Sequence, residues 1–327
     1  MTIRDTAALR QHARSALENA PTQRTVALVF AAVTVGISLV LNLADTALSE
    51  MIAGTGGLSN MGTRTILSTL QSMLPILQTL ILLGWNAGYT MAVLKIDRGQ
   101  HADGNTLKSG FSLFFPLLRC LLLEAAIYFG MSALSFFLAI QIYMFTPWAK
   151  ELLEIMEPML PSILGTTPVI DEAAMLPALQ AMAPMMLIFG ALYFLLAVPT
   201  SYRLRMRIFC LIDNPRAGAI RAIATSRRIM RRNCFQLFKL DLSFWWYHGL
   251  MLLATAIQLL PLTDLLPMDF DTAYYVCFGV YLAMIFGIYA LLRNPVETAY
   301  AAAYETLRDK PEETQTNQVV LGNIFDM

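Results

Sequence analysis

Six long apolar stretches constrain the fold of this chain more than any other feature. Each is long enough to cross the hydrocarbon core of a bilayer, which takes a helix of about 20 residues. A helix satisfies its own backbone hydrogen bonds in lipid, whereas an open sheet cannot. The chain is therefore predicted to be all-α, a polytopic transmembrane helical bundle of about six spans. The predicted spans are residues 25–43, 66–94, 117–145, 184–202, 240–262 and 273–292.

The composition excludes an ordinary soluble protein. Of the 327 residues, 57% are hydrophobic and only 14% are charged, whereas soluble domains have about 25% charged residues. We therefore interpret residues 1–310 as a single membrane domain. Residues 311–327 are polar and are predicted to form a disordered cytoplasmic tail.

The positive charges predict an orientation. If the N-terminus lies inside the cell, 21 of the 23 Lys and Arg residues fall in inner segments, and only Arg64 and Lys150 fall outside. Cytoplasmic loops are enriched in Lys and Arg. The pattern therefore predicts a multi-pass protein of the plasma membrane with both termini in the cytoplasm. The outer segment 146–183 is predicted to be a helical loop, either a lid on the bundle or a ligand-binding cap.

The inner segment 203–239 carries ten basic residues and a single acid, Asp213. At about 100° per residue, the arginines that follow Pro215 lie on one side of a helix, opposite small and apolar residues. The pattern predicts an in-plane basic amphipathic helix on the cytoplasmic side, where anionic lipid headgroups attract each Lys or Arg by about 1 kcal/mol. The alternative is that the arginines only fix the topology, and nucleic-acid binding is disfavoured because no aromatic residues interleave with them. The predicted lipid- or partner-binding residues are Arg216, Arg221, Arg227, Arg228, Arg231 and Arg232.

No motif of catalysis, cofactor binding or metal binding is present in the sequence. The chain has three histidines and four cysteines, without a C-x-x-C pair, a phosphate-binding loop or a nucleophile elbow. We therefore expect no cofactor, no metal site, no catalytic residues and no enzymatic activity. A membrane enzyme acting on lipid-linked substrates is a third hypothesis that only isolated acids support.

Four ionisable residues fall inside predicted spans, where charges are costly and often functional. They are Arg119, Glu124, Asp241 and His248. Asp241 and His248 are seven residues apart and are predicted to share one side of a helix. Either these groups pair between helices, or Glu124, Asp241 and His248 line a proton or solute path. Gln71, Gln78 and Asn86 in the second span could line the same interior or could join helices.

A sequence signature lies between residues 212 and 244. It comprises Ile212-Asp213-Asn214-Pro215, Ala217-Gly218-Ala219-Ile220, Ser226, Met230, Phe235-Gln236-Leu237-Phe238 and Leu240-Asp241-Leu242-Ser243-Phe244. It resembles the signature of a bacterial integral-membrane family of unknown function, the domain of unknown function nine-seven-five. The Tyr- and Ala-rich run Ala299–Tyr304 is similar to another element of that family. Arg231-Arg232-Asn233 stands where members usually have a Gly, and Trp245-Trp246 follows directly where many have Ile-Gly-Trp. The resemblance implies a bacterial cell-membrane protein but no activity.

Together these features favour a non-enzymatic multi-pass membrane protein whose basic cytoplasmic helix engages anionic lipid or a membrane partner. The bilayer itself is the expected partner, and the sequence does not identify a protein partner. The alternative is a small-solute transporter or export component that uses Glu124, Asp241 and His248.

Overall fold

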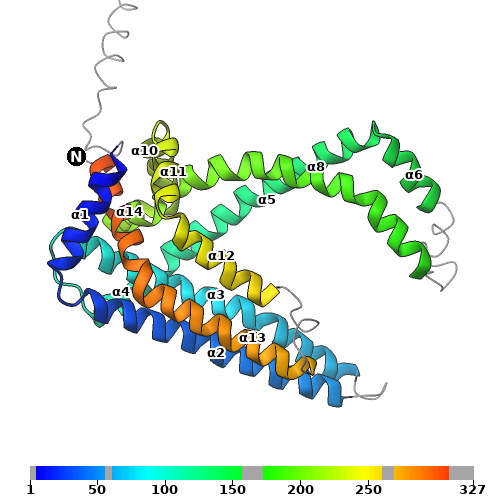
Figure 1. Ribbon diagram of the computed structural model, residues 1–327, viewed down its shortest axis with the longest axis horizontal. Helices are drawn as coiled ribbons and strands as arrows, with labels where there is room; N and C mark the ends of the chain where they lie inside the picture. Colours follow the sequence, from blue (N-terminus) through cyan, green and yellow to red (C-terminus); the bar gives the residue numbers. More distant parts are fainter. Residues whose placement is uncertain (1–4, 56–60, 157–171, 260–268, 309–327) are drawn as a thin grey trace, which may run out of the picture. The chain divides into compact units, whose positions relative to one another are not determined.

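The computed structural model describes residues 5–55, 61–156, 172–259 and 269–308 (Figure 1). These residues form helices joined by short turns, and no strand occurs among them, which confirms the all-α prediction. The chain divides into two compact units. Unit 1 comprises residues 1–118 and 206–327, and unit 2 comprises residues 119–205.

Unit 1 contains three long apolar helices and a set of shorter ones. Figure 1 shows α2, α3 and α13 running side by side. Their bounds and those of the other helices of this unit are α1 (Thr6–Glu18), α2 (Gln23–Gly54), α3 (Met61–Asp97), α4 (Gly104–Ser109), η2 (Gly110–Leu113), α9 (Arg207–Asp213), η4 (Pro215–Ala217), α10 (Gly218–Met230), α11 (Cys234–Ser243), α12 (Trp245–Leu259), α13 (Phe270–Gly287), η6 (Ile288–Leu292, a π-helix) and α14 (Arg293–Arg308).

Unit 2 consists of most of α5 (Phe114–Met144), α6 (Pro147–Met156) and α8 (Glu172–Leu204). The hydroxyl of Tyr143 in α5 donates to the carbonyl oxygens of Trp148 (2.9 Å) and Ala181 (2.8 Å), so it ties α5 to both other helices. Helix α6 packs against α8 around buried Tyr143, Ala149 and Met185. Residues 172–183, which we predicted within the outer loop, are part of α8. Residues 157–171 lie outside the described residues, as does the predicted tail 311–327.

Five helical stretches are long and apolar enough to cross a membrane. They are Gln23–Gly54, Met61–Asp97, Gly104–Met144, Leu179–Asp213 and Thr272–Arg308, and they account for five of the six predicted spans. The predicted span 240–262 does not form one helix, because the backbone breaks at Phe244 between α11 and α12. Its last residues, 260–262, lie outside the described residues. The number of spans and the orientation therefore stay predictions.

Polar side chains join α2 to α3. Gln71 Nε2 donates to Ser49 Oγ (2.8 Å) and Gln78 Nε2 donates to Ser38 Oγ (3.1 Å). Hydrogen bonds of this kind between apolar helices hold bundles together in lipid. Of our two hypotheses for Gln71 and Gln78, these bonds favour the joining of helices.

Glycines let the α4–η2 segment touch α3. A Cβ atom on Gly88 would lie 1.8 Å from the carbonyl oxygen of Leu107, and a Cβ on Gly110 would lie 2.2 Å from the backbone nitrogen of Gly88. Neither position has room for a side chain, because the obstructing atoms are backbone. Small residues allow helix backbones to approach closely in membrane proteins.

Gly88→Ala is expected to destabilise unit 1, because the two segments must separate to accept the methyl group. Overpacking of this kind typically costs about 1–3 kcal/mol. Thermal unfolding of the purified chain in detergent would measure the loss. Gly36→Ala in α2 is the matched control, since nothing lies within 4 Å of its added Cβ. Equal melting temperatures for the two variants would contradict the packing described here.

Candidate functional site

The six arginines predicted to bind lipid or a partner lie at one end of unit 1, where α1, α10, α11 and α14 are found (Figure 1). We call this the arginine-rich end. The side chains of all six are exposed. On the opposite side of α10, Ala219, Ala222, Ile223, Ser226 and Met230 are buried, and this side packs against α9. The apolar face of α10 is therefore used inside the protein, and its arginine face points outward.

Helix α11 has an exposed apolar stripe. Phe235, Phe238 and Leu242 are 65%, 44% and 60% exposed. They occupy positions i, i+3 and i+7, which lie on one side of a helix. Lys239 is on the same side, with Nζ 4.9 Å from the centre of the Phe235 ring, and Trp245 just beyond the helix is also exposed. Aromatic residues beside cations are typical of membrane interfaces.

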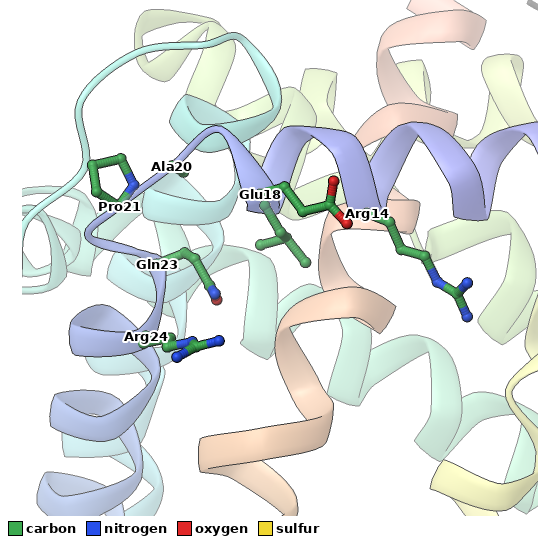
Figure 2. Close-up of a pocket in the computed structure, with 7 residues that line it drawn as sticks. Arg14, Glu18, Ala20, Pro21, Gln23 and Arg24 are labelled. Carbon is green, nitrogen blue, oxygen red and sulfur yellow. The ribbon is translucent and has the colours of Figure 1, made fainter.

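A pocket of about 500 Å³ opens where α1 turns into α2. Figure 2 shows Arg14 and Glu18 on α1 and Gln23 and Arg24 at the start of α2 bordering this space. The turn is tied to the α3–α4 connection, because the hydroxyl of Thr22 donates to the carbonyl oxygen of Ala102 (2.5 Å). The arginine-rich end therefore carries two basic surfaces, one on α10 and one around this pocket.

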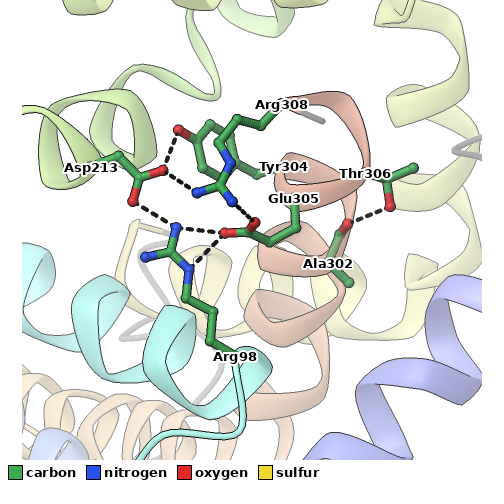
Figure 3. Close-up of polar contacts among 7 residues, drawn as sticks. All are labelled: Arg98, Asp213, Ala302, Tyr304, Glu305, Thr306 and Arg308. Atoms are coloured by element: carbon green, nitrogen blue, oxygen red, sulfur yellow. Dashed lines mark hydrogen bonds and ion pairs between the residues drawn. The ribbon is translucent and has the colours of Figure 1, made fainter. Parts of the chain in front are cut away.

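Beside α10, Asp213 is the centre of a charged network (Figure 3). Its carboxylate accepts from Arg98 Nη2 (2.6 Å), Arg308 Nη1 (3.0 Å) and the Tyr304 hydroxyl (2.8 Å). Glu305 completes the network by accepting from Arg98 Nη2 (2.6 Å) and pairing with Arg308 Nη2 (2.9 Å). The network joins the end of α3, the end of α9 and the last turns of α14.

The protonation of Arg98 follows from this setting. Partial burial opposes its charge, but the hydrogen bonds to Asp213 and Glu305 and the attraction of both carboxylates outweigh that effect and raise the pKa of Arg98. Arg98 is thus a permanent cation whose charge the network neutralises. The exposed arginines of α10, which follow this network in the chain, therefore carry the outward-facing positive charge.

Helix α14 contacts the signature segment through two tyrosines, one turn apart. The hydroxyl of Tyr304 donates to Asp213, and that of Tyr300 donates to Asp241. Both tyrosines are buried, and so are Ala299, Ala301, Ala302 and Ala303 between and beside them. The two sequence elements that carry the family resemblance therefore meet in space.

At the start of α14, Arg293 lies in a cage of aromatic rings. Its guanidinium carbon lies 4.5 Å from the ring centre of Phe30 and 4.8 Å from those of Tyr89 and Tyr289. Arg293 Nη2 donates to Asn86 Oδ1 (3.0 Å), and Glu297 lies 3.5 Å from its Nε. The side chain is 12% exposed. Rings from α2, α3 and η6 and a carboxylate from α14 thus replace the water around this cation.

The next residue, Asn294, connects the same helices. Its Nδ2 donates to the backbone and side-chain oxygens of Gln23 (2.9 and 2.8 Å), and its Oδ1 accepts from Tyr89. The π-helix η6 ends immediately before Arg293. A π-helical turn rotates the residues that follow it about the helix axis, and such turns are frequent at functional sites. Here the turn places Arg293 and Asn294 towards α2 and α3.

The four ionisable residues predicted within spans do not share one helix face. Asp241 lies in the last turn of α11 and is held by Tyr300, whereas His248 lies in α12, so the single helix on which we predicted both residues is interrupted at Phe244. His248 packs edge-on against Tyr247, and no hydrogen-bond partner of its buried Nε2 lies among the described residues. Arg119 and Glu124 belong to unit 2, where Arg119 is exposed and Glu124 is half-buried.

Several residues of this end were not predicted as site residues. Arg98 and Arg293 are among the 21 inner Lys and Arg residues of the topology argument, and Asp213 is predicted only as the single acid of segment 203–239 and as part of the family signature. The signal for Arg293 was its position directly before Asn294-Pro295 at the end of an apolar run. Of the three rings, only that of Tyr289 is near Arg293 in the chain; no local pattern indicates Phe30 and Tyr89, because they come from α2 and α3.

The described residues thus define the class of the protein: an all-helical chain with membrane-compatible helices and a polar, arginine-rich end. The comparison with family models then places it, because the model "Protein of unknown function (DUF975)" matches residues 1–310. The chain belongs to this family, as its signature predicted. Comparisons with curated proteins and with solved structures find no match.

Arg293→Lys is expected to lower the melting temperature of the detergent-solubilised protein. A lysine keeps the charge but lacks the flat guanidinium that stacks on three rings and reaches Asn86, and the loss should be about 1–3 kcal/mol. The control is Arg227→Lys on the exposed face of α10. If both variants melt at the wild-type temperature, the cage has no structural role.

Proposed function

We propose that this protein is a non-enzymatic membrane protein whose arginine-rich end binds anionic lipid headgroups through α10. The observation that carries the proposal is the exposure of all six arginines in and beside α10, while the opposite face of this helix is buried. Part of the proposal is that this end faces the cytoplasm, where anionic lipids are enriched in many membranes.

The α11 stripe supports the proposal. It offers Phe235, Phe238 and Leu242 to an apolar environment directly after the arginines in the chain. A surface with cations beside exposed aromatic residues matches the boundary between headgroups and acyl chains. An acidic soluble partner protein could pair with the arginines, but it would leave the apolar stripe of α11 exposed to water. The arrangement therefore favours lipid over a soluble partner.

The chemistry of arginine also fits phosphate. Each guanidinium offers several donors in a plane and can bind a phosphate through two parallel hydrogen bonds. The network around Asp213 and the buried face of α10 hold the helix in place, so its backbone needs little ordering when headgroups bind.

A second candidate function, a small-solute path, has one supporting observation. A pocket of about 220 Å³ lies among α2, α3, α12 and α13 and is lined by polar groups that include Asn42, Asp45, Gln78 and Gln258. We prefer lipid binding, because Asp241 of the predicted path is engaged by Tyr300 and Gln78 is engaged by Ser38.

The lipid proposal predicts a salt-sensitive preference for anionic lipid around the protein. The full chain would be reconstituted with spin-labelled phosphatidylglycerol or phosphatidylcholine, and the immobilised fraction of each would be measured. Changing Arg221, Arg227, Arg228 and Arg231 to Gln should lower the selectivity for phosphatidylglycerol several-fold, since each nearby cation contributes about 1 kcal/mol.

The matched control changes the same four arginines to Lys, which keeps the charge and should keep most of the selectivity. Added salt should reduce the wild-type preference, because exposed charges are screened. Unchanged selectivity in the Gln variant would refute the proposal.

A further inference from the structure

A groove runs along unit 1 between α1, α2 and the start of α14, well apart in sequence from α10. It consists of the pocket at the α1–α2 turn (Figure 2) and a second pocket of about 400 Å³. Leu17, Gln23 and Arg24 border both pockets, so the two lie next to each other. We call them the polar pocket and the apolar pocket.

The polar pocket has the chemistry of an anion site. Arg14 from α1 and Arg24 from α2 border it, both with exposed side chains, and Glu18 is the acid on its rim. Two arginines and one glutamate give the lining a net charge of one positive unit. This balance suits a ligand with a single negative charge, such as a phosphodiester, and guanidinium donors match phosphate oxygens in geometry.

The apolar pocket has the chemistry of an acyl-chain site. Leu28, Leu291 and Pro295 line it, and Leu28 and Leu291 are 47% and 74% exposed. A groove with open leucine walls between two candidate membrane spans can be entered sideways from lipid.

The order of the two pockets follows the depth of a bilayer. Arg24 is the second residue of α2, which is a candidate membrane span. Leu28 lies one turn further along, about 6 Å deeper at 1.5 Å per residue. Leu291, in η6 within the candidate span Thr272–Arg308, is on the opposite wall. Phosphate-binding groups thus lie at the end of the span and apolar groups lie within it.

The walls of the groove are fixed before any ligand binds. Leu9, Ala13 and Leu17 of α1 are buried, and α1 packs against α14. Asn294 holds Gln23 at the junction of the two pockets through two hydrogen bonds. A preformed groove loses little entropy on binding. This favours one tightly bound lipid molecule over a shell of weakly bound lipids around the protein.

We propose that this groove binds one anionic phospholipid molecule, with its phosphodiester on Arg14 and Arg24 and one acyl chain along Leu28 and Leu291. The site is separate from the α10 surface, and each can exist without the other. It would hold a lipid as a resident component at the α1–α2 junction.

Native mass spectrometry of the full chain, titrated with phosphatidylglycerol in detergent, tests the site. We expect one molecule bound more tightly than any further ones. The pair Arg14→Gln with Arg24→Gln should weaken that first binding about tenfold or more, from the loss of two cations. Because both side chains are exposed, melting temperatures should stay at the wild-type value.

The matched control is Arg64→Gln with Lys108→Gln, two exposed cations outside both the groove and α10, which removes the same charge and should leave the first binding within about twofold. If this control weakens it as much as the Arg14 and Arg24 pair, the lipid senses overall charge and the site is refuted. Equal binding of phosphatidylcholine, or displacement by millimolar inorganic phosphate alone, would also overturn the proposal. The variant with Arg221, Arg227, Arg228 and Arg231 changed to Gln distinguishes the two proposals. If it loses the spin-label selectivity but still binds the first lipid molecule tightly, the groove and the α10 surface are separate sites.

Discussion

Two tyrosine hydroxyls on α14 hold the arginine-rich end together, and the other features of that end depend on them. Tyr304 donates to Asp213 at the end of α9, and Tyr300 donates to Asp241 in α11. Helix α10 lies between these two anchor points in the chain. Without them, the mutual repulsion of its arginines would oppose a fixed position, because few acids are available nearby to offset it.

The family signature acquires a physical meaning from these contacts. Asp213 and Asp241 belong to the segment that resembles the family, and their partners belong to the Tyr- and Ala-rich helix. Alanines between the tyrosines let α14 sit deep in unit 1, while Arg293 in its aromatic cage fixes the other end of the same helix. The signature therefore describes how a polar end is assembled from distant segments.

The sequence predicted much of the fold, because apolar length is a local property. To within one residue, five of the predicted spans fall in helical stretches that are long and apolar enough to cross a membrane. The break at Phe244 was not predicted, since the apolar run continues through Ser243-Phe244-Trp245 without a Pro or Gly. The candidate site was harder. The arginines of α10 follow from periodicity, but the cage around Arg293 and the network around Asp213 need partners more than 80 residues away in the chain, which no local pattern reveals.

The most direct test of this account is amide hydrogen exchange on a double variant, Tyr300→Phe with Tyr304→Phe, in a reconstituted membrane. If the hydroxyls hold the end in place, amides in α9 to α11 should exchange about tenfold faster or more, while those of α2 and α3 keep their rates. Tyr275→Phe, at an exposed position of α13, serves as control and should change nothing. Wild-type exchange rates throughout α9–α11 in the double variant would contradict the account.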